Sequence, residues 1–487
     1  MSITPPSTQP PSLGPPSLGP PSPRPPSPLE IEEVLLEIVL HLDRQSLHSC
    51  VSVSKIFYRA SIRALWSTVR WKNQTSNNDS FLSQFERYGH YAVEFQDNSN
   101  ANLDMIAQVC TNLRELRLTW TLVWDEKLEC ILRSSPKISR LFLFSCSPLT
   151  TLALSHIGNL TGLRRLELKN YNHVDEPSIV ALLRSCLMLE HLVLEDVRLN
   201  GILLDSLGET PLNIKILALT RSAPSGNLVK NLIRNSHSIR QFSLARNGHS
   251  ALSVDELLTI RKSYRHLSNL NLESCKGFDN EALLVLFQTC SNLVRVNVSG
   301  TKIMDSSLDA LAANCPELRS LNLAWCSYIT DGGLLRLLQS CSGLAFLDIS
   351  TMDKVSAAIF YPGDSWACTR LETLISIGID MVRPSGSLRR NHAMMFSQLS
   401  RLETLQDLAI GGTNLVLELE AGLSKMGQLS QLVSFRLSPV QGVLGEDEIR
   451  WLVEAWPKLR RVKFESGSLP SPWLRYFRRQ RPHLVFG

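Results

Sequence analysis

A short hydrophobic pattern, L-x-x-L-x-L or a close variant, recurs fourteen times between Leu113 and Phe464 and constrains the fold more than any other feature. The first copy is LRELRL from Leu113, the last is LRRVKF from Leu459, and successive copies begin 25 to 34 residues apart. Such a period is typical of solenoids, because one repeat cannot bury its apolar face alone and stacks on its neighbours. The chain is therefore predicted to form a stacked array of repeats.

Each repeat predicts one strand and one returning helix. The alternation at the end of the pattern indicates a short strand whose leucines point inward. The following segment, such as DGGLLRLLQSC at Asp331–Cys341, has the apolar spacing of a helix. Strands stack at roughly 4.8 Å and helices need about twice that width, so strands inside and helices outside force a curve. We predict an α/β fold: a horseshoe-shaped solenoid with parallel strands on the concave face.

Composition and pattern divide the chain into five predicted parts. The leader is rich in proline and serine and has little apolar surface to bury, so we expect it to be disordered. Its Ser-Pro and Thr-Pro steps leave phosphorylation open as an alternative role, and PPSPRPP leaves docking to an SH3-type groove open. The parts are a leader at 1–27, a helical module at 28–70, a linker and N-terminal capping repeat at 71–108, the solenoid at 109–470 and a C-terminal cap or tail at 471–487.

The helical module is predicted to contain three short helices. Ser27 and Glu30 have the spacing of a capping box, and Asp43 is a suitable cap for a second helix. Three short helices in about forty residues bury too small a core to be stable alone. This module is therefore expected to be stabilised by contacts with the segment that follows it, with a partner, or with both. The apolar stripe of the first helix consists of Ile31, Val34, Leu35, Ile38 and Leu42.

Nine of the eleven cysteines fall into two registers of the repeat. Six lie three residues before the first leucine of their repeats, and three lie three residues after the last core position of the strand. Cysteines in register are separated by a whole repeat, so we favour small buried packing over a metal site, and no metal is expected. The sequence has no basic start followed by an apolar core, which favours the reducing cytoplasm or nucleus and argues against disulfides.

The chain resembles the F-box and leucine-rich-repeat proteins. CPELRSLNLAWCSYITDGGLLRLLQSC, at Cys315–Cys341, is similar to the cysteine-containing subtype of the repeat. The segment from Leu29 to Trp66 resembles an F-box, with IEEVLLEIVLHLD, SLHSCVSVSKIFYRA and LW in order, although Glu32 stands where the family usually has proline.

The resemblance implies a substrate receptor of a Skp–cullin–F-box ubiquitin ligase. In that family the F-box binds the Skp adaptor of the cullin complex, and the repeats hold a protein substrate. The resemblance to the F-box implies that eight residues of this chain face the adaptor or pack within the module: Ile31, Val34, Leu35, Ile38, Leu42, Leu47, Val53 and Phe57.

Side chains between the core leucines are predicted to lie on the concave face and to bind the target. Phe142 and Phe144 have two open interpretations, contact with the target or cover by N-terminal structure; for Trp325 we favour local packing. The basic residues Arg140, Arg165 and Lys169 would suit a phosphate. The candidate residues are Arg117, Arg140, Phe142, Phe144, Arg165, Lys169, Arg295, Trp325 and Phe346.

Catalytic motifs are missing from the sequence. It contains no phosphate loop, dinucleotide fingerprint, nucleophile elbow or H-E-x-x-H segment, so we expect neither an active site nor a cofactor. No run of about eighteen apolar residues suggests a membrane span, and a formal charge of +5 does not argue for a nucleic-acid binder.

Several alternatives stay open. The long interval between Leu371 and Leu405 contains an insertion, GIDMVRPSGSLRRNHAMMF at Gly378–Phe396, that is either a binding loop or disordered. The basic and aromatic stretch from Trp473 to His483 favours a closing cap over nucleic-acid contact. Besides a ligase receptor, the chain could be a repeat scaffold without a role in ubiquitin transfer, or a small-GTPase regulator that supplies an arginine.

Overall fold

The computed structural model separates the chain into two compact units, Met1–Thr68 and Val69–Gly487. It describes residues 32–72, 79–98, 102–146, 149–200, 207–247, 252–361, 366–382, 388–412, 414–438, 445–464, 475 and 479–486. The proline-rich leader, Ile31 and, within the stretch from Trp473 to His483, residues 473–474 and 476–478 therefore lie outside the described residues.

The first unit contains the three predicted helices, α1 (Glu32–Val39), α2 (Arg44–Cys50) and α3 (Lys55–Ser67). Side-chain caps fix where two of them begin. The Ser46 amide donates to the Asp43 carboxylate at 2.7 Å, and the Phe57 amide donates to the Ser54 hydroxyl at 3.3 Å. These bonds satisfy backbone amides of the first turn, which have no partner within the helix. They define the N-termini of α2 and α3, so that short turns connect the three helices.

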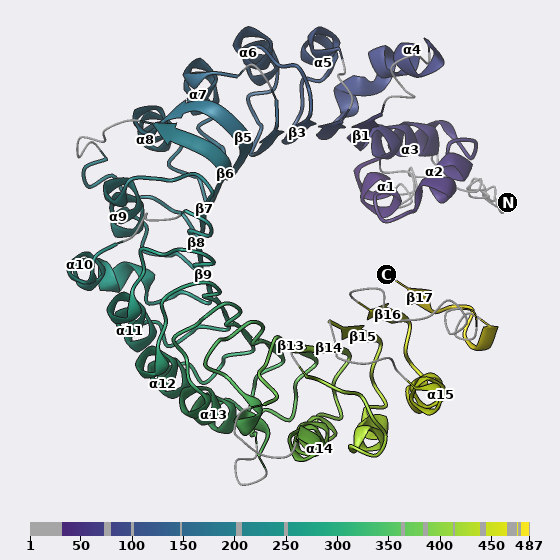
Figure 1. Ribbon diagram of the computed structural model, residues 1–487. Coiled ribbons are helices and arrows are strands. Elements are labelled where there is room, and N and C mark those ends of the chain that lie inside the picture. The colour runs from purple at the N-terminus through teal and green to yellow at the C-terminus, as the bar shows by residue number, and fades with distance from the viewer. Residues whose placement is uncertain are drawn as a thin grey trace, which may run out of the picture. The chain divides into compact units, whose positions relative to one another are not determined.

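The second unit is a solenoid whose strands from β2 to β17 pair in parallel in sequence order (Figure 1). The register places successive core positions side by side, for example Leu116 with Leu141 and Leu141 with Leu166. The strands are β1 (Thr68–Trp71), β2 (Glu94–Asp97), β3 (Glu115–Thr119), β4 (Arg140–Phe144), β5 (Arg165–Asp175), β6 (His191–Asn200), β7 (Ile216–Thr220), β8 (Gln241–Ser243), β9 (Asn269–Asn271), β10 (Arg295–Asn297), β11 (Ser320–Asn322), β12 (Phe346–Asp348), β13 (Thr373–Ile377), β14 (Asp407–Gly411), β15 (Ser434–Leu437), β16 (Arg461–Phe464) and β17 (Val485–Phe486).

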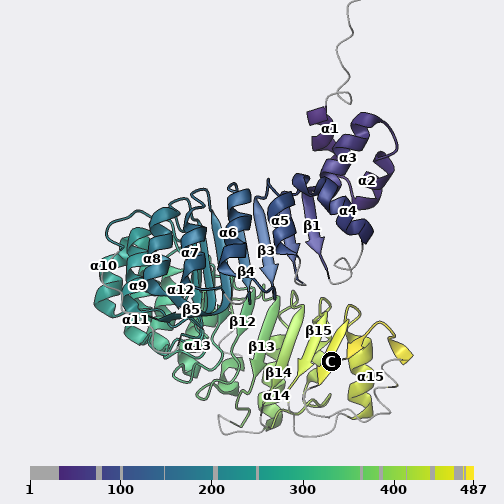
Figure 2. The same cartoon turned by 90° about the horizontal axis from the view of Figure 1, so that it is seen from above.

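Helices lie on the outer side of this curved sheet (Figures 1 and 2). Together with the parallel strands, they confirm the predicted leucine-rich-repeat solenoid behind a three-helix module. The helices are α4 (Asp79–Tyr88), α5 (Leu103–Val109), α6 (Asp125–Ser134), α7 (Thr151–Gly158), α8 (Glu176–Ser185), α9 (Gly226–Asn235), α10 (Val254–Tyr264), α11 (Asn280–Thr289), α12 (Asp305–Asn314), α13 (Asp331–Ser340), α14 (Leu388–Leu399) and α15 (Glu446–Ala455), with short 3-10 turns η2 (Gly89–Tyr91), η3 (Ala357–Phe360) and η4 (Leu423–Gln428).

A left-handed residue follows the strand in most coils and extends the ladder of backbone hydrogen bonds. The Trp120 amide donates to Phe144 O at 2.9 Å, and the Trp325 amide donates to Ser350 O, also at 2.9 Å. This turn directs the side chain at that position to one edge of the sheet. These residues have φ between 52° and 84°, and they are Trp120, Ser145, Arg221, Arg246, Ser274, Gly300, Trp325, Thr351 and Gly378, with Asn170 and Asp196 at the equivalent positions inside the longer strands β5 and β6.

Acidic residues at the start of the outer helices join successive coils. The Asp305 carboxylate accepts from the Thr330 amide at 2.9 Å and from its hydroxyl at 2.6 Å. Asp331 binds Ser356 in the same way, with both contacts at 2.7 Å. The acceptor also lies at a helix N-terminus, where a negative charge is favourable. These two-point contacts fix the rotation of one helix relative to the next.

The long interval between Leu371 and Leu405 contains a helix. Within it, α14 packs on the core through Met395, Phe396 and Leu399, which are buried. The expectation of a binding loop or a disordered insertion was wrong for this part of the interval, because the apolar spacing of a helix lies within it; only residues 383–387 lie outside the described residues. Among the residues that the structure describes, no helix is long and apolar enough to cross a membrane.

Candidate functional site

The three-helix unit has an apolar core on one side of α1 and exposed apolar side chains on the other. Leu35 and Val39, one helical turn apart, are completely buried with Leu47 of α2. Val34 and Ile38 precede them by one position each and stay exposed. A unit of this size cannot surround a helix that is apolar on two faces, so the second face remains open to another molecule.

The structure divides the predicted adaptor-facing residues into two groups. Val34, Ile38, Leu42 and Val53 are exposed, and Val53 is the most exposed of them at 62%. The remaining described candidates, Leu35, Leu47 and Phe57, belong to or pack against the core of the unit. Of the two roles expected for these positions, the burial of Leu35 and Leu47 favours packing over contact with the adaptor.

Two exposed residues of the same unit were missing from the sequence prediction. Leu40, directly after α1, is exposed, and so is Tyr58 on α3. Leu40 lies off the i, i+3, i+4 stripe that was used to select candidates, so periodicity alone excluded it. Tyr58 follows Phe57, which packs inward, and no local signal distinguishes the two directions.

Near its N-terminal end, the concave face of the second unit is covered by arginines that contact aromatic rings. The Arg117 guanidinium lies 3.9 Å from the centroid of the Phe142 ring, and that of Arg165 lies 5.2 Å away. Phe142 is only 3% exposed as a result, whereas Phe144 is partly exposed. Phe142 is thus covered by side chains of the adjacent strands rather than by N-terminal structure, and direct target contact is corrected to internal cover.

Carboxylates neutralise the basic residues of this region. Arg140 binds Glu94 at 3.0 Å and Glu115 at 2.6 Å, and Arg165 binds Glu167 at 2.5 Å. A phosphate would have to displace carboxylates that already occupy these donors. The arrangement therefore does not favour the phosphate site predicted at Arg140, Arg165 and Lys169.

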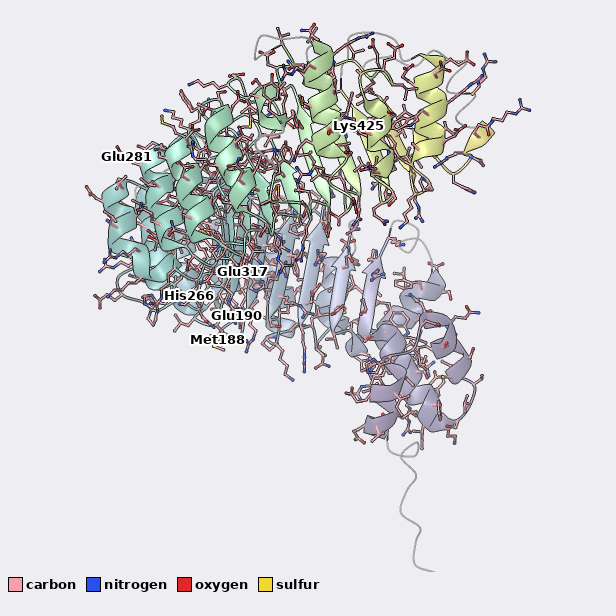
Figure 3. All side chains as sticks on the ribbon, turned by 90° about the horizontal axis from the view of Figure 1, so that it is seen from below. Met188, Glu190, His266, Glu281, Glu317 and Lys425 are labelled. Carbon is pink, nitrogen blue, oxygen red and sulfur yellow. The ribbon has the colours of Figure 1, made fainter. Side chains whose placement is uncertain are left out.

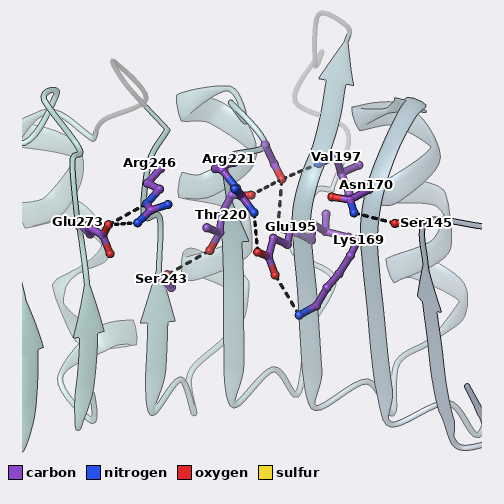
Figure 4. A network of polar contacts seen from close by, with 12 residues as sticks. Ser145, Lys169, Asn170, Glu195, Val197, Thr220, Arg221, Ser243, Arg246 and Glu273 are labelled. Atoms are coloured by element: carbon purple, nitrogen blue, oxygen red, sulfur yellow. Dashed lines mark hydrogen bonds and ion pairs between the residues drawn. The ribbon is translucent and has the colours of Figure 1, made fainter. Parts of the chain in front are cut away.

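Lys169 shares a carboxylate with an arginine two coils away. Glu195 lies between Lys169 and Arg221, at 3.0 Å and 2.8 Å respectively (Figure 4). The hydrogen bond from Lys169 is the main cause that lowers the pKa of Glu195, and Arg221 adds to it. Farther along the same edge, Arg246 binds Glu273 at 2.6 Å. The charged groups drawn in Figure 4 thus form ion pairs within the solenoid.

The opposite edge of the sheet, where the chain enters each strand, carries the same kind of pair. Glu190, labelled in Figure 3, precedes β6 and accepts from Lys215 at 2.6 Å and from Arg164 at 2.7 Å. The bond from Lys215 is the main cause that lowers the pKa of Glu190. Surface pairs of this type add little stability each, but they leave few free charges for a ligand.

A hollow of about 440 Å³ with both polar and apolar lining lies on the concave face over β7–β12. Arg295 and Phe346, both candidates from the sequence, line it together, with Arg295 exposed and Phe346 partly exposed. Ile216 and Ala218 contribute apolar surface from β7. The hollow brings together residues up to 130 positions apart in the sequence, because each coil contributes the same positions of its strand. Its polar lining is Gln241, Ser243, Asn269, Asn271, Arg295, Asn297, Ser320 and Asn322.

Asparagines form a ladder through this hollow. The side-chain oxygen of Asn271 accepts from the Glu273 amide at 3.1 Å, that of Asn297 from the Ser299 amide at 3.1 Å, and that of Asn322 from the Ala324 amide at 3.0 Å. These bonds fix the orientation of each amide, because only its oxygen can accept. The ladder therefore presents the NH₂ groups of these side chains to the hollow.

Exposed aromatic residues lie on the loop edge rather than on the strands. Trp325 is 66% exposed, so the expected local packing of this residue was wrong. Its left-handed conformation, with φ of 63°, turns the indole away from the core. Trp120 occupies the same position of an earlier coil and is 70% exposed, with exposed Leu122 and Trp124 following it. The alternation in TWTLVW is the sequence signal for the last two residues.

The nine cysteines in repeat register are buried, as predicted, and pack between coils. The Cys315 thiol lies 3.3 Å from Cys290 O, and that of Cys326 lies 3.2 Å from Val298 O. Burial raises the pKa of Cys315 to about 12 and that of Cys326 to about 11. Thiols in this state are poor nucleophiles and poor metal ligands. Within the described ranges, no group of three His, Cys, Asp or Glu residues could hold a metal ion.

Comparisons with known proteins find one family model that matches the first unit and several solved structures that cover most of the chain. The F-box domain model matches residues 32–64, which include the exposed and buried faces of α1. A chain of the Rad7 and Elc1 complex in yeast is 15% identical, with 91% of this chain and 98% of that chain covered and a TM-score of 0.46. An internalin from Listeria monocytogenes is 16% identical (75% and 88% covered, TM-score 0.43), and a leucine-rich-repeat protein from Leptospira interrogans is also 16% identical (93% and 97% covered, TM-score 0.38). The solenoid fold is established by the parallel strand pairing of this chain itself.

Proposed function

We propose that this chain is the substrate-recognition subunit of a Skp–cullin–F-box ubiquitin ligase. The F-box domain would bind a Skp-family adaptor, and the solenoid would bind a protein target. The chain would have no catalytic site, and its contribution would be proximity, because it holds a target lysine near the conjugating enzyme. The two registers of buried cysteines further favour the cysteine-containing subtype of repeat, and the role implies the cytoplasm or the nucleus.

The exposed apolar face of the F-box domain carries this proposal. Val34, Ile38, Leu42 and Val53 are exposed, and all four lie within the residues that the F-box domain model matches. Contiguous exposed apolar surface on a small unit marks an interaction site, since its burial by a partner is favourable by about 25 cal/mol per Å². The core residues behind this face, Leu35 among them, hold it in place.

A pull-down with purified Skp-family adaptor and cullin tests the proposal. Replacing Val34 and Ile38 together by Asp places two charges on the exposed face, and adaptor capture should fall by more than about tenfold because the charges would have to be buried. The same change at Leu152, an exposed apolar residue of α7, is the matched control and should leave capture unchanged. All three positions are exposed, so the circular-dichroism spectra should match that of the wild type.

The result separates the proposal from its alternatives. Capture of adaptor and cullin by the wild type and the Leu152→Asp variant, but not by the double variant, supports a ligase subunit. Capture of neither adaptor nor cullin by the wild type refutes the proposal. Capture of the adaptor without cullin would instead favour a scaffold outside ubiquitin transfer.

A further inference from the structure

Arg295 differs from the other basic residues that the strand register places on the concave face between β3 and β12. Arg117, Arg140, Arg165 and Lys169 each bind a carboxylate. Arg295 has no carboxylate within 4.0 Å among the described residues, and its side chain is exposed in the hollow over β7–β12. One positive charge in this region therefore has no counter-charge from the chain itself.

The surroundings of Arg295 offer hydrogen-bond donors. The oxygens of Asn271, Asn297 and Asn322 are engaged by backbone amides of their own turns, so their NH₂ groups are what remains for a ligand. Asn297 also donates to Glu273, at 3.5 Å, and Glu273 is bound by Arg246. Hydrogen-bond donors around an unpaired guanidinium are complementary to a negatively charged ligand group that only accepts hydrogen bonds.

The rim of the hollow limits the size and charge of that acceptor. Asp348 occupies the equivalent ladder position of β12, next to Asn322, and its carboxylate accepts from the Ser350 amide at 3.0 Å. A second negative charge on the ligand would approach this carboxylate. Phosphate recognition generally uses clusters of arginines, whereas one unpaired arginine matches one carboxylate. Phe346 and Ile216 provide apolar surface on the two sides of the donors.

We propose that the hollow over β7–β12 binds an acidic peptide segment of a protein target, with an Asp or Glu carboxylate of the target on Arg295 and a neighbouring apolar side chain against Phe346. This inference rests on the proposed function, since it specifies which targets the ligase subunit would hold. The asparagine amides would donate to carbonyl oxygens of the peptide, one per coil. The ion-paired region over β3–β6 would contribute little to affinity.

A random phage-displayed dodecapeptide library, selected on the full-length protein, tests the proposal. Selected peptides should be enriched in Asp or Glu next to an aromatic or aliphatic residue. A synthetic, fluorescently labelled copy of one selected peptide is then titrated by anisotropy. Arg295→Ala should weaken binding by about tenfold or more, because a charged hydrogen-bonded pair is lost. Phe346→Ala should weaken it as well.

Matched variants separate a direct contact from a general effect of charge. Arg221→Ala also removes one concave-edge cation, but Glu195 keeps Lys169 as a partner, so peptide affinity should stay within twofold. Replacing the acidic residue of the peptide by its amide should weaken binding to the wild type and have little further effect on Arg295→Ala. Such coupling identifies the pair.

Several results would overturn the proposal. The first is that the selected peptides are not enriched in Asp or Glu. The second is that the Arg295→Ala variant binds the peptide as tightly as the wild type does. The third is that a peptide binds only when it is phosphorylated. Adaptor capture by the same Arg295→Ala variant is measured in parallel and should be unchanged. If the peptide results contradict the expectation while the wild type still captures the adaptor, only the proposal of an acidic target is refuted. If the wild type does not capture the adaptor, the proposed role in a ligase is refuted.

Discussion

Two adjacent glycines at the start of α13 should respond in opposite ways to the same substitution. Gly332 and Gly333 both lie in the first turn of the helix, so helix propensity predicts that Ala stabilises each by up to about 1 kcal/mol. Their surroundings differ. A Cβ on Gly332 would meet nothing closer than 3.5 Å, which is an ordinary contact.

A Cβ on Gly333 would overlap Asp305. It would lie 2.8 Å from the Asp305 Cβ and closer still to the carboxylate carbon. The carboxylate cannot move aside freely, because it holds the Thr330 amide and hydroxyl at 2.9 Å and 2.6 Å. Overpacking of this kind costs about 1–3 kcal/mol. After a propensity gain of about 1 kcal/mol is subtracted, Gly333→Ala should destabilise by up to roughly 2 kcal/mol, and Gly332→Ala should stabilise.

The effect should be local, because solenoid stability is a sum over coils and their interfaces. Guanidinium unfolding followed by circular dichroism gives the overall change, and hydrogen exchange with mass spectrometry shows where it lies. Faster exchange is expected in α12 and α13 of Gly333→Ala and not in the F-box domain. A third variant, Asp305→Ala, removes the carboxylate and keeps only the Cβ contact at 2.8 Å. In that background the penalty of Gly333→Ala should become smaller.

Stability of Gly333→Ala equal to that of Gly332→Ala would refute this reasoning. So would an unchanged penalty in the Asp305→Ala background, since the overlap with the carboxylate would then not be the cause.

Two further predictions follow from buried titratable groups. Iodoacetamide at pH 8 should alkylate the exposed Cys130 in the native protein and leave Cys315 unmodified until denaturation, because burial raises the pKa of Cys315 to about 12; equal rates, measured by peptide mass spectrometry, would contradict this. His392 is buried with its Nε2 3.1 Å from Asn414 O, and burial lowers its pKa below the ordinary value. In the unfolded chain the His392 imidazole binds a proton near pH 6.5, whereas in the folded chain it stays neutral at that pH. The free energy of unfolding therefore falls as pH drops from 7.5 to 5.5. The melting temperature of His392→Gln should fall less over that range, and an equal fall would contradict the assignment.

The repeat architecture could be predicted from the sequence because its signals are local. The alternation in each L-x-x-L-x-L segment determines which side chains face the core, and the register then aligns positions such as Leu116, Leu141 and Leu166 without further information. The burial of the cysteines follows from the same register. The hollow over β7–β12 could be predicted in part from the same pattern, because Arg295 and Phe346 occupy outward positions of their strands.

The tertiary structure decided which outward residues remain available. Leu35 and Val34 are neighbours in one apolar stripe, and only the packing of α2 and α3 separates core from surface. Lys169 and Arg295 look alike in the sequence, yet Glu195 neutralises the first and no described carboxylate neutralises the second. Periodicity is a property of one segment, whereas burial and charge compensation depend on groups that other coils or helices bring within a few ångströms. That is why the sequence alone predicted the scaffold, and the contacts between its parts selected the candidate sites.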